Sequence, residues 1–210
     1  MPGSAQDFDT QDNLYTVCVR GVENGNTVSE NIVCEAISRV VSAADNWSDI
    51  LKTAESPDME VVISNTTEVG LQYVAETGAG VPVSYPGKLT AWLLQRFNAG
   101  QKGVVIIPTE LVVDNGKILK SLIQQQIKAQ GLSKDFEQWV NQENHFCSSL
   151  VDRIVPGKPS KEEHDALNKE LGYEDALLVK SEAYALWAIE GSDEIRDILT
   201  FEKSHPGVVI

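Results

Sequence analysis

The feature that most constrains this fold is an alternation of short apolar runs with amphipathic segments between residues 59 and 130. Met59–Ile63 and Gly103–Ile107 are nearly continuous apolar runs, as in parallel strands that are covered on both faces. Residues 88–97 and 116–130 carry apolar side chains at helical spacing. Strand–helix alternation of this length predicts an α/β fold, with a parallel sheet and flanking helices.

The segments on either side are less regular. Residues 1–13, rich in Gly, Ser, Asp and Gln, are expected to be a disordered lead-in, and residues 14–28 to form a hairpin with a turn at 23–26. Residues 36–54 contain helical stretches, and Ser133 caps a further helix. Beyond Pro156 we expect a mixed extension: a helix over 161–171, a strand over 183–189, and a strand or short helix over 195–201.

Polar side chains gather where the two apolar strands end. Ser64, Asn65, Thr66, Thr67 and Glu68 follow the first strand. Ligands of open α/β sheets bind beyond the carboxyl ends of the strands, and this set of hydroxyls, amide and carboxylate suits a ribose or a nicotinamide carboxamide. The alternative is a strand-to-helix turn in which Thr and Asn cap a helix.

A second polar cluster follows the next strand. It runs from Thr109-Glu110 to Asp114-Asn115-Gly116. Glu110 and Asn115 are therefore candidates for the substrate side of the site or its support. Taken alone, Asn-Gly before a helix is a turn and a cap.

Asp152 and Arg153 stand in an apolar run of Leu150, Val151 and Ile154. Burying either charge alone would cost several kcal/mol. The two must therefore pair with each other, reach water at a cleft, or hold a ligand. A structural ion pair is the alternative to a functional role.

Composition limits the possible partners. The formal net charge of -14 argues against nucleic acid and against a membrane surface, since both would repel it. The sequence shows no signal peptide and no apolar run long enough to span a bilayer, so a cytoplasmic location is expected. The three cysteines fit reduced thiols, and no spacing of His and Cys suggests a metal site.

Asn144-x-Phe-x-x-x-x-Val-Asp-Arg-Ile-x-Pro156 resembles the signature of the long-chain mannitol dehydrogenase family. Four other segments agree in the same chain order: 11–16 with Arg20-Gly21, 63–68, 84–90, and 107–111 with Asn115-Gly116. The resemblance implies an incomplete Rossmann-like domain over 14–156, with 157–210 leading toward an all-α catalytic domain. It also implies an NAD-dependent oxidoreductase, of the branch that reduces a keto-uronate such as tagaturonate to an aldonate with NADH.

The same resemblance assigns roles and gaps. It places Asp152 near the nicotinamide, and Arg153 follows it in the motif. Leu111 stands where the family has an Asn that holds the substrate oxygen, which weakens that role here. The catalytic lysine, with nearby Asn and His, is expected on a helix beyond this sequence, so no catalytic residue is assigned.

The chain lacks the glycine-rich turn that a Rossmann domain uses to approach the pyrophosphate. NAD binding by this chain is therefore doubtful, and we expect a central fragment that does not turn over substrate alone. An exposed sheet edge could then allow self-association. The competing hypotheses are a free-standing binding or assembly module without catalysis, and a hydrolase using Cys147 with His145 or His164.

Overall fold

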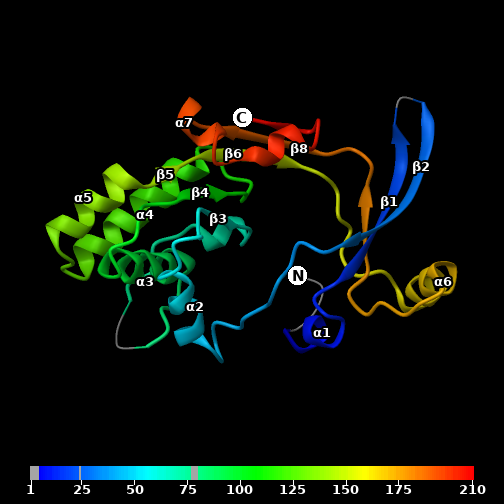
Figure 1. The fold of residues 1–210 in the computed structure, drawn as a ribbon, viewed down its shortest axis with the longest axis horizontal. Helices are drawn as coiled ribbons and strands as arrows, with labels where there is room; N and C mark the ends of the chain where they lie inside the picture. The colour runs from blue at the N-terminus through cyan, green and yellow to red at the C-terminus, as the bar shows by residue number, and fades with distance from the viewer. Residues whose placement is uncertain (1–4, 24, 77–79) are drawn as a thin grey trace. The chain divides into compact units, whose positions relative to one another are not determined.

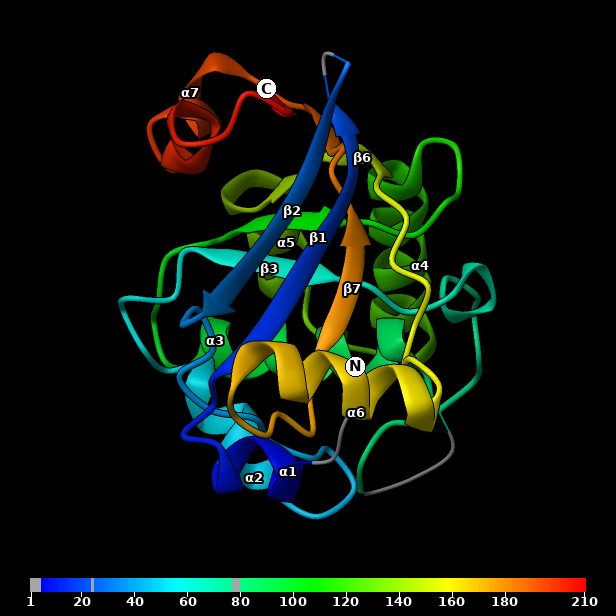
Figure 2. The same cartoon turned by 90° about the vertical axis from the view of Figure 1, so that its right-hand side faces the viewer.

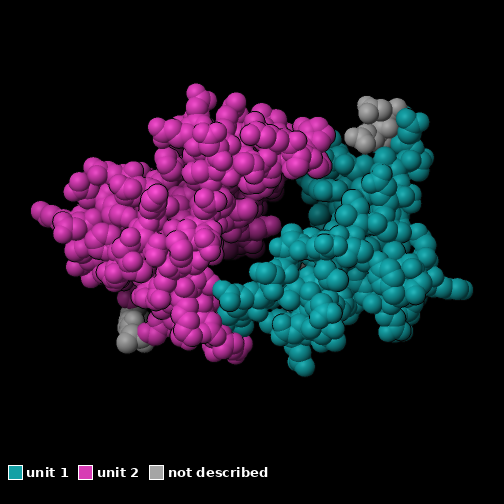
Figure 3. Space-filling model, in the orientation of Figure 1, with its two compact units in different colours: residues 1–42, 152–185 teal, residues 43–151, 186–210 magenta. Residues whose placement is uncertain are grey.

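The computed structural model describes residues 5–23, 25–76 and 80–210 and has an α/β architecture, divided into two compact units (Figure 3). Unit 1 comprises residues 1–42 and 152–185, and unit 2 comprises residues 43–151 and 186–210. This division differs from the expected boundary at Pro156. Residues after Asp152 pack with the N-terminal hairpin, whereas the last 25 residues pack with the central strands, so each unit is built from two separate parts of the chain.

The centre of unit 2 is a parallel sheet of three strands in the order β3-β4-β5. The strands are β3 (Val61–Ser64), β4 (Val105–Pro108) and β5 (His145–Phe146). Val61 lies opposite Val105, and Ser64 lies opposite Pro108. Both apolar runs therefore form strands as predicted. β3 is an edge of this sheet, and Ile63 on it is 51% exposed.

Both faces of this sheet are covered, because side chains alternate along β4. Ile106 packs in one cluster with helices α3 (Tyr85–Asn98), α4 (Asn115–Ala129) and α5 (Lys134–Glu143). Val105 and Ile107 pack in a second cluster with residues from 187–201. Figure 1 shows β6 and β8 on the side of β4 opposite α3. Every residue of β4 is buried. This explains why its sequence is continuously apolar rather than alternating.

The helices begin where the sequence supplies capping residues. The Ser84 hydroxyl accepts from the Gly87 amide at α3, and the Ser133 hydroxyl accepts from the Phe136 amide at α5. A shorter helix, α2 (Trp47–Thr53), precedes β3, and a 3-10 turn, η1 (Glu68–Gly70), follows it. The helical stretches expected over residues 36–54 are thus confined to 47–53.

The C-terminal part of unit 2 forms a second small sheet in the order β6-β8-β9. Its strands are β6 (Ser148–Asp152), β8 (Leu186–Glu190) and β9 (Val208–Val209). Two short helices, α7 (Asp193–Arg196) and η2 (Thr200–Lys203), lie between β8 and β9. Of the strand or short helix expected over 195–201, the structure has the helical alternative, as two short pieces separated by residues 197–199. The Trp187 and Phe201 rings stack at 5.2 Å.

Unit 1 is built on a sheet in the order β2-β1-β7 (Figure 2). Strand β1 (Tyr15–Glu23) pairs antiparallel with β2 (Asn26–Cys34), as the hairpin prediction required, and parallel with β7 (Val179–Glu182). The turn at Asn24 lies outside the described residues. Helix α6 (Lys161–Leu171) has its predicted bounds, with Ser160 at its start and Gly172 at φ 79° after its end.

Buried Asp175 ties the two parts of unit 1 together. Its carboxylate accepts from the Thr16 amide at 2.6 Å and from the Gln11 side chain at 2.8 Å. The expectation of disorder over residues 1–13 is wrong for residues 5–10, which form helix α1 (Ala5–Thr10). The polar composition concealed one anchor, Phe8, which is buried and meets the Tyr15 ring edge-on at 6.1 Å.

A search of the described ranges for a bilayer-spanning helix, one both long and apolar enough, finds none.

Candidate functional site at the carboxyl edge of the central sheet

The two segments that leave β3 and β4 are joined directly. The Thr109 amide and hydroxyl both donate to the Ser64 carbonyl, at 2.9 and 2.7 Å. Because β3 and β4 are parallel and in register, their carboxyl ends reach the same edge of the sheet. The two polar clusters noted in the sequence, after β3 and after β4, therefore lie at the same edge.

Glu110 is the centre of this junction. Its carboxylate is 3% exposed and accepts three hydrogen bonds. The Thr66 amide and hydroxyl each donate to Oε1 at 2.8 Å, and the Ser64 hydroxyl donates to Oε2 at 3.0 Å. Among the described residues, no lysine, arginine or histidine forms an ion pair with it. Neutral donors alone therefore hold this buried carboxylate.

Tyr85, the first residue of α3, belongs to the same neighbourhood. Its hydroxyl is buried and has no hydrogen-bond partner within the part of the chain that is described. Burial raises the pKa of Tyr85 to about 12; the Ser64 hydroxyl lowers that pKa and the Glu110 charge raises it. The phenol therefore stays protonated near neutral pH, buried beside Ser64 and Glu110.

Asn115, at the start of α4, is fully buried and fully bonded. Its Nδ2 group donates to the carbonyls of Pro108, Glu110 and Ser149, at 3.1, 2.9 and 2.9 Å. Its Oδ1 accepts from the Ser149 amide at 2.9 Å. The side chain thus joins the end of β4 to β6, and every polar atom it has is used within the protein.

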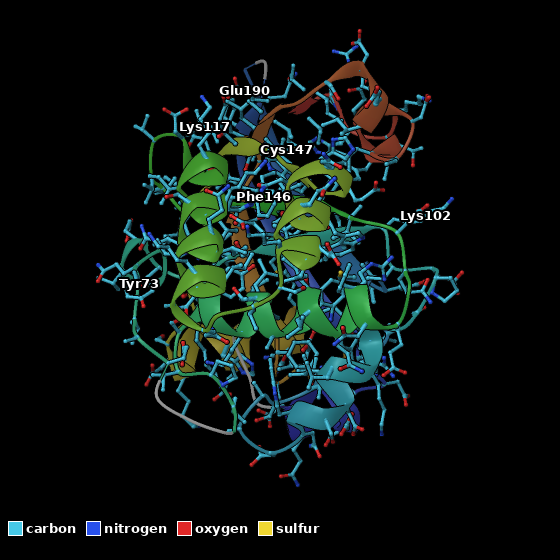
Figure 4. The ribbon with its side chains drawn as sticks, turned by 90° about the vertical axis from the view of Figure 1, so that its left-hand side faces the viewer. Tyr73, Lys102, Lys117, Phe146, Cys147 and Glu190 are labelled. Atoms are coloured by element: carbon cyan, nitrogen blue, oxygen red, sulfur yellow. The ribbon has the colours of Figure 1, made fainter. Side chains whose placement is uncertain are left out.

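A cavity of about 580 Å³ opens beside this junction. Its lining combines the loop after β4 with β6, β8 and β9: residues 110–114, 148–150, 188–190 and Val209. The Ser148 hydroxyl is buried there without a partner in the described residues. Lys117 and Glu190 lie close enough for the Glu190 charge to act on the amine, at the same end of α4 (Figure 4). The cavity can hold a small molecule.

Lys117 interacts with two residues of the cavity lining, Asp114 and Glu190. Its amine lies 2.7 Å from Asp114 Oδ1. That hydrogen bond and the Asp114 charge raise the pKa of Lys117. A general base needs the opposite shift, so this lysine is unsuited to accept a proton from a substrate.

The remaining members of the first polar cluster face solvent. Asn65, Thr67 and Glu68 are exposed, whereas Ser64 is buried and Thr66 is partly buried. Helix capping, the alternative reading of this cluster, accounts for little here, since η1 begins after Thr67 without a side-chain capping bond. These three side chains are therefore available to a ligand.

Asp152 and Arg153 are placed in unit 1, at and just after the end of β6. Both are exposed, so their charges are accommodated by contact with water rather than by pairing with each other. The Arg153 guanidinium donates to the Glu182 carbonyl at 3.2 Å, rather than to Asp152. Their neighbours Leu150 and Ile154 are 55% and 62% exposed.

The cysteines and acidic groups offer little alternative chemistry. Cys147 is buried, and burial raises its pKa to about 11, to which the Glu190 charge adds. Such a thiol is not a nucleophile near neutral pH, which removes the support for a Cys147 hydrolase. In the described portion, no three His, Cys, Asp or Glu side chains gather as metal ligands.

Two residues of the site were missed from the sequence. Tyr85 lies in the Ser84–Thr90 segment and Ser149 in the Asn144–Pro156 segment, and both segments were noticed only for their resemblance. No local pattern marks Ser149, because its role depends on Asn115, which is 34 residues away. For Tyr85, a large phenol at a helix start beside a buried strand was the only available signal.

Comparison with known proteins gives a consistent picture. The family model described as the mannitol dehydrogenase Rossmann domain matches residues 1–202. The chain is 47% identical to the altronate oxidoreductase of Halalkalibacterium halodurans over 200 residues, and 42% identical to that of an Enterobacter species over 210. These matches cover 92% and 97% of this chain but 39% and 43% of the relatives. The chain thus spans well under half the length of the curated relatives it matches.

Solved structures show the same fold. A D-sorbitol dehydrogenase in substrate-free form superposes with a TM-score of 0.75 at 24% identity, over 88% of this chain and 40% of that one. Mannitol 2-dehydrogenase of Pseudomonas fluorescens, in a ternary complex with NAD and D-mannitol, gives 0.76 at 23%, over 90% and 40%. The predicted Rossmann-like α/β class is therefore confirmed.

Proposed function

Because the chain belongs to the mannitol dehydrogenase family through its Rossmann domain, we propose that it is part of an NAD-dependent enzyme that interconverts altronate and tagaturonate. The substrate assignment is supported by the altronate oxidoreductases at 40–47% identity. Such a reduction moves a hydride from NADH to the keto carbon and a proton to its oxygen. The chain contributes the nucleotide-side domain of that enzyme.

We propose that the cofactor contacts the edge formed by Asn65, Thr67 and Glu68. Their exposure supports this role. The chemistry of the set fits a ribose or carboxamide, since hydroxyl, amide and carboxylate groups recognise such groups through hydrogen bonds. The single observation that carries the proposal is the convergence of this segment with Glu110 at the carboxyl ends of parallel strands.

The cavity of about 580 Å³ is the proposed place for the sugar acid. Glu110 and Asn115 support its wall from behind, since both side chains are buried and bonded within the protein. Asp152 and Arg153 are a separate candidate contact in unit 1, proposed on the motif alone. Because the chain spans only 39% and 43% of its altronate oxidoreductase relatives and no catalytic residue is assigned in it, we also propose that it does not complete the reaction by itself.

NADH binding by the purified chain tests the proposal. Titration followed by nicotinamide fluorescence should show saturable binding, weakened at least about fivefold by Asn65→Ala or Thr67→Val, since each loses a hydrogen bond worth about 1 kcal/mol or more. Asn98→Ala, at an exposed position at the end of α3, is the matched control and should bind as the wild type does. Absence of any NADH binding would refute the cofactor role of this edge. Steady oxidation of NADH with tagaturonate would refute the proposed inactivity.

A further inference from the structure

We propose that Glu110 is a positioning residue, which sets the affinity of the site for the cofactor by fixing the backbone of Thr66. This inference rests on the proposed cofactor role of residues 65–68. Glu110 is buried and is assigned no direct contact with a ligand. Its two carboxylate oxygens are instead divided between two residues of the opposite segment: Oε1 for Thr66 and Oε2 for Ser64.

The contact to Thr66 is unusual in being double. One oxygen accepts both the amide and the hydroxyl of Thr66 at 2.8 Å, so the carboxylate fixes the backbone and the side-chain rotamer together. Thr66 sits between Asn65 and Thr67, which are exposed. Fixing the middle residue therefore fixes the direction in which both neighbours project.

Glu110 is itself held from the other side. Its carbonyl accepts from Asn115 Nδ2 at 2.9 Å and from the Val112 amide at 2.7 Å. Asn115 is anchored at the start of α4 and on Ser149. The position of Thr66 is thereby fixed relative to α4 and β6, and does not depend on its own loop alone. A ligand that contacts 65–67 meets a preformed segment and loses less free energy in ordering it.

This link depends on the acceptor atoms of the Glu110 side chain. A carboxylate offers only acceptors, which matches three incoming donors from Thr66 and Ser64. Glutamine could keep its oxygen toward Thr66 and donate its NH2 group to the Ser64 hydroxyl, which can also accept, so it would preserve the contact. Methionine has a similar size and offers these three donors no comparable acceptor. Glu110→Met should therefore release Thr66 without leaving a large cavity.

Amide hydrogen exchange, together with an NADH titration of the same chain, tests this role. In Glu110→Met, exchange at the Thr66 amide should speed up at least about tenfold relative to the Ile106 amide, and the Kd for NADH should rise by a similar factor. Thr109→Val is the matched control. It removes the neighbouring hydroxyl bond to the Ser64 carbonyl and leaves Glu110 intact. It should leave the Thr66 amide protected.

A double-mutant cycle separates positioning from general damage. Thr66→Val keeps the amide bond but removes the hydroxyl bond to Oε1. If Glu110 acts through Thr66, the combined variant should bind NADH no more weakly than Glu110→Met alone. Additive losses, or unchanged exchange at Thr66, would overturn the inference. A wild-type chain that binds no NADH would instead sink the proposed function, and Thr66 exchange alone would then decide the role of Glu110.

Discussion

Asn115 and Ser149 form a reciprocal pair of hydrogen bonds. Asn115 Nδ2 donates to the Ser149 carbonyl, and the Ser149 amide donates to Asn115 Oδ1, both at 2.9 Å. The asparagine side chain behaves here like one more residue of a strand. It closes the gap between the end of β4 and β6 that no backbone pairing fills.

Replacement of Asn115 by Asp should destabilise unit 2 strongly. The carboxylate would face three carbonyl oxygens that now accept from Nδ2, so we expect a loss of about 3 kcal/mol or more in the free energy of unfolding. Urea denaturation followed by tryptophan fluorescence measures it. In Asn141→Asp, an exposed site where the new carboxylate can still accept from Gln124, the change should stay within about 0.5 kcal/mol. Equal losses of unfolding free energy at both sites would contradict this role of Asn115.

Arg96 should be equally sensitive, because its guanidinium is buried and donates to four backbone carbonyls: those of Ala54, Ser56, Met59 and Lys102. Arg96→Met would leave these carbonyls unpaired and cost about 3 kcal/mol or more. The loss of unfolding free energy in Arg96→Lys should be smaller than in Arg96→Met but still measurable, since an ammonium group cannot reach all four carbonyls as the guanidinium does. Arg39→Met, at an exposed position, serves as the control. An Arg96→Met variant whose free energy of unfolding in urea equals that of the wild type would contradict this role of Arg96.

Glu76 predicts a dependence of stability on pH. Burial raises its pKa, but hydrogen bonds from Ser84 and Val83 and the charge of Lys88 lower it more, so the folded-state pKa lies below the usual value. A depressed pKa adds stability that is present above the unfolded-state pKa of about 4.3 and is lost as pH falls through the folded-state value.

Glu76→Gln should therefore unfold at a lower temperature than the wild type at neutral pH. The difference in melting temperature should shrink as pH falls below about 4. Glu137, an exposed residue in the first turn of α5, gives a matched control as Glu137→Gln. A difference between wild type and Glu76→Gln that stays constant from neutral to acidic pH would rule out the ionic contribution.

The thiols should differ sharply in reactivity. Burial raises the pKa of both Cys18 and Cys147, the latter to about 11, whereas Cys34 is only partly buried. With a disulfide reagent at about pH 8, Cys34 should react first and the other two only on unfolding. Cys34→Ser should remove the fast phase. Fast modification of Cys147 in the folded chain would reopen the question of a reactive thiol.

Local patterns were sufficient for some elements. Helix α6 was predicted to the residue, because Ser160 and Gly172 mark its ends and its polar composition needs no tertiary partner. β3 and β4 were both visible as apolar runs. β4 fits the expectation for a strand buried on both faces, whereas β3 is an edge strand on which Ile63 is half exposed. β7 was missed, since Lys180, Ser181 and Glu182 look like a loop until they pair with β1, about 160 positions earlier.

The site was predictable only in outline. Parallel strands bring their carboxyl ends together, so Ser64 and Glu110 could be expected at one edge. Which atoms meet could not be foreseen, because Thr66 and Glu110 are 44 residues apart and their contact depends on register. Asn115 shows the same limit. Its sequence context indicates a turn, and its structural role requires Ser149.

The bond between Thr16 and Asp175 spans 159 residues and sets an order of events during synthesis. Once residues 43–151 have emerged from the ribosome, β3, β4, β5 and helices α3, α4 and α5 are all available to fold. β1 can pair with β2 locally, but its pairing with β7 and the bond from Thr16 must wait until Asp175 and β7 emerge, and closing so long a loop slows that step. We therefore expect the Thr16 amide, which donates to Asp175, to be among the last to gain protection during folding.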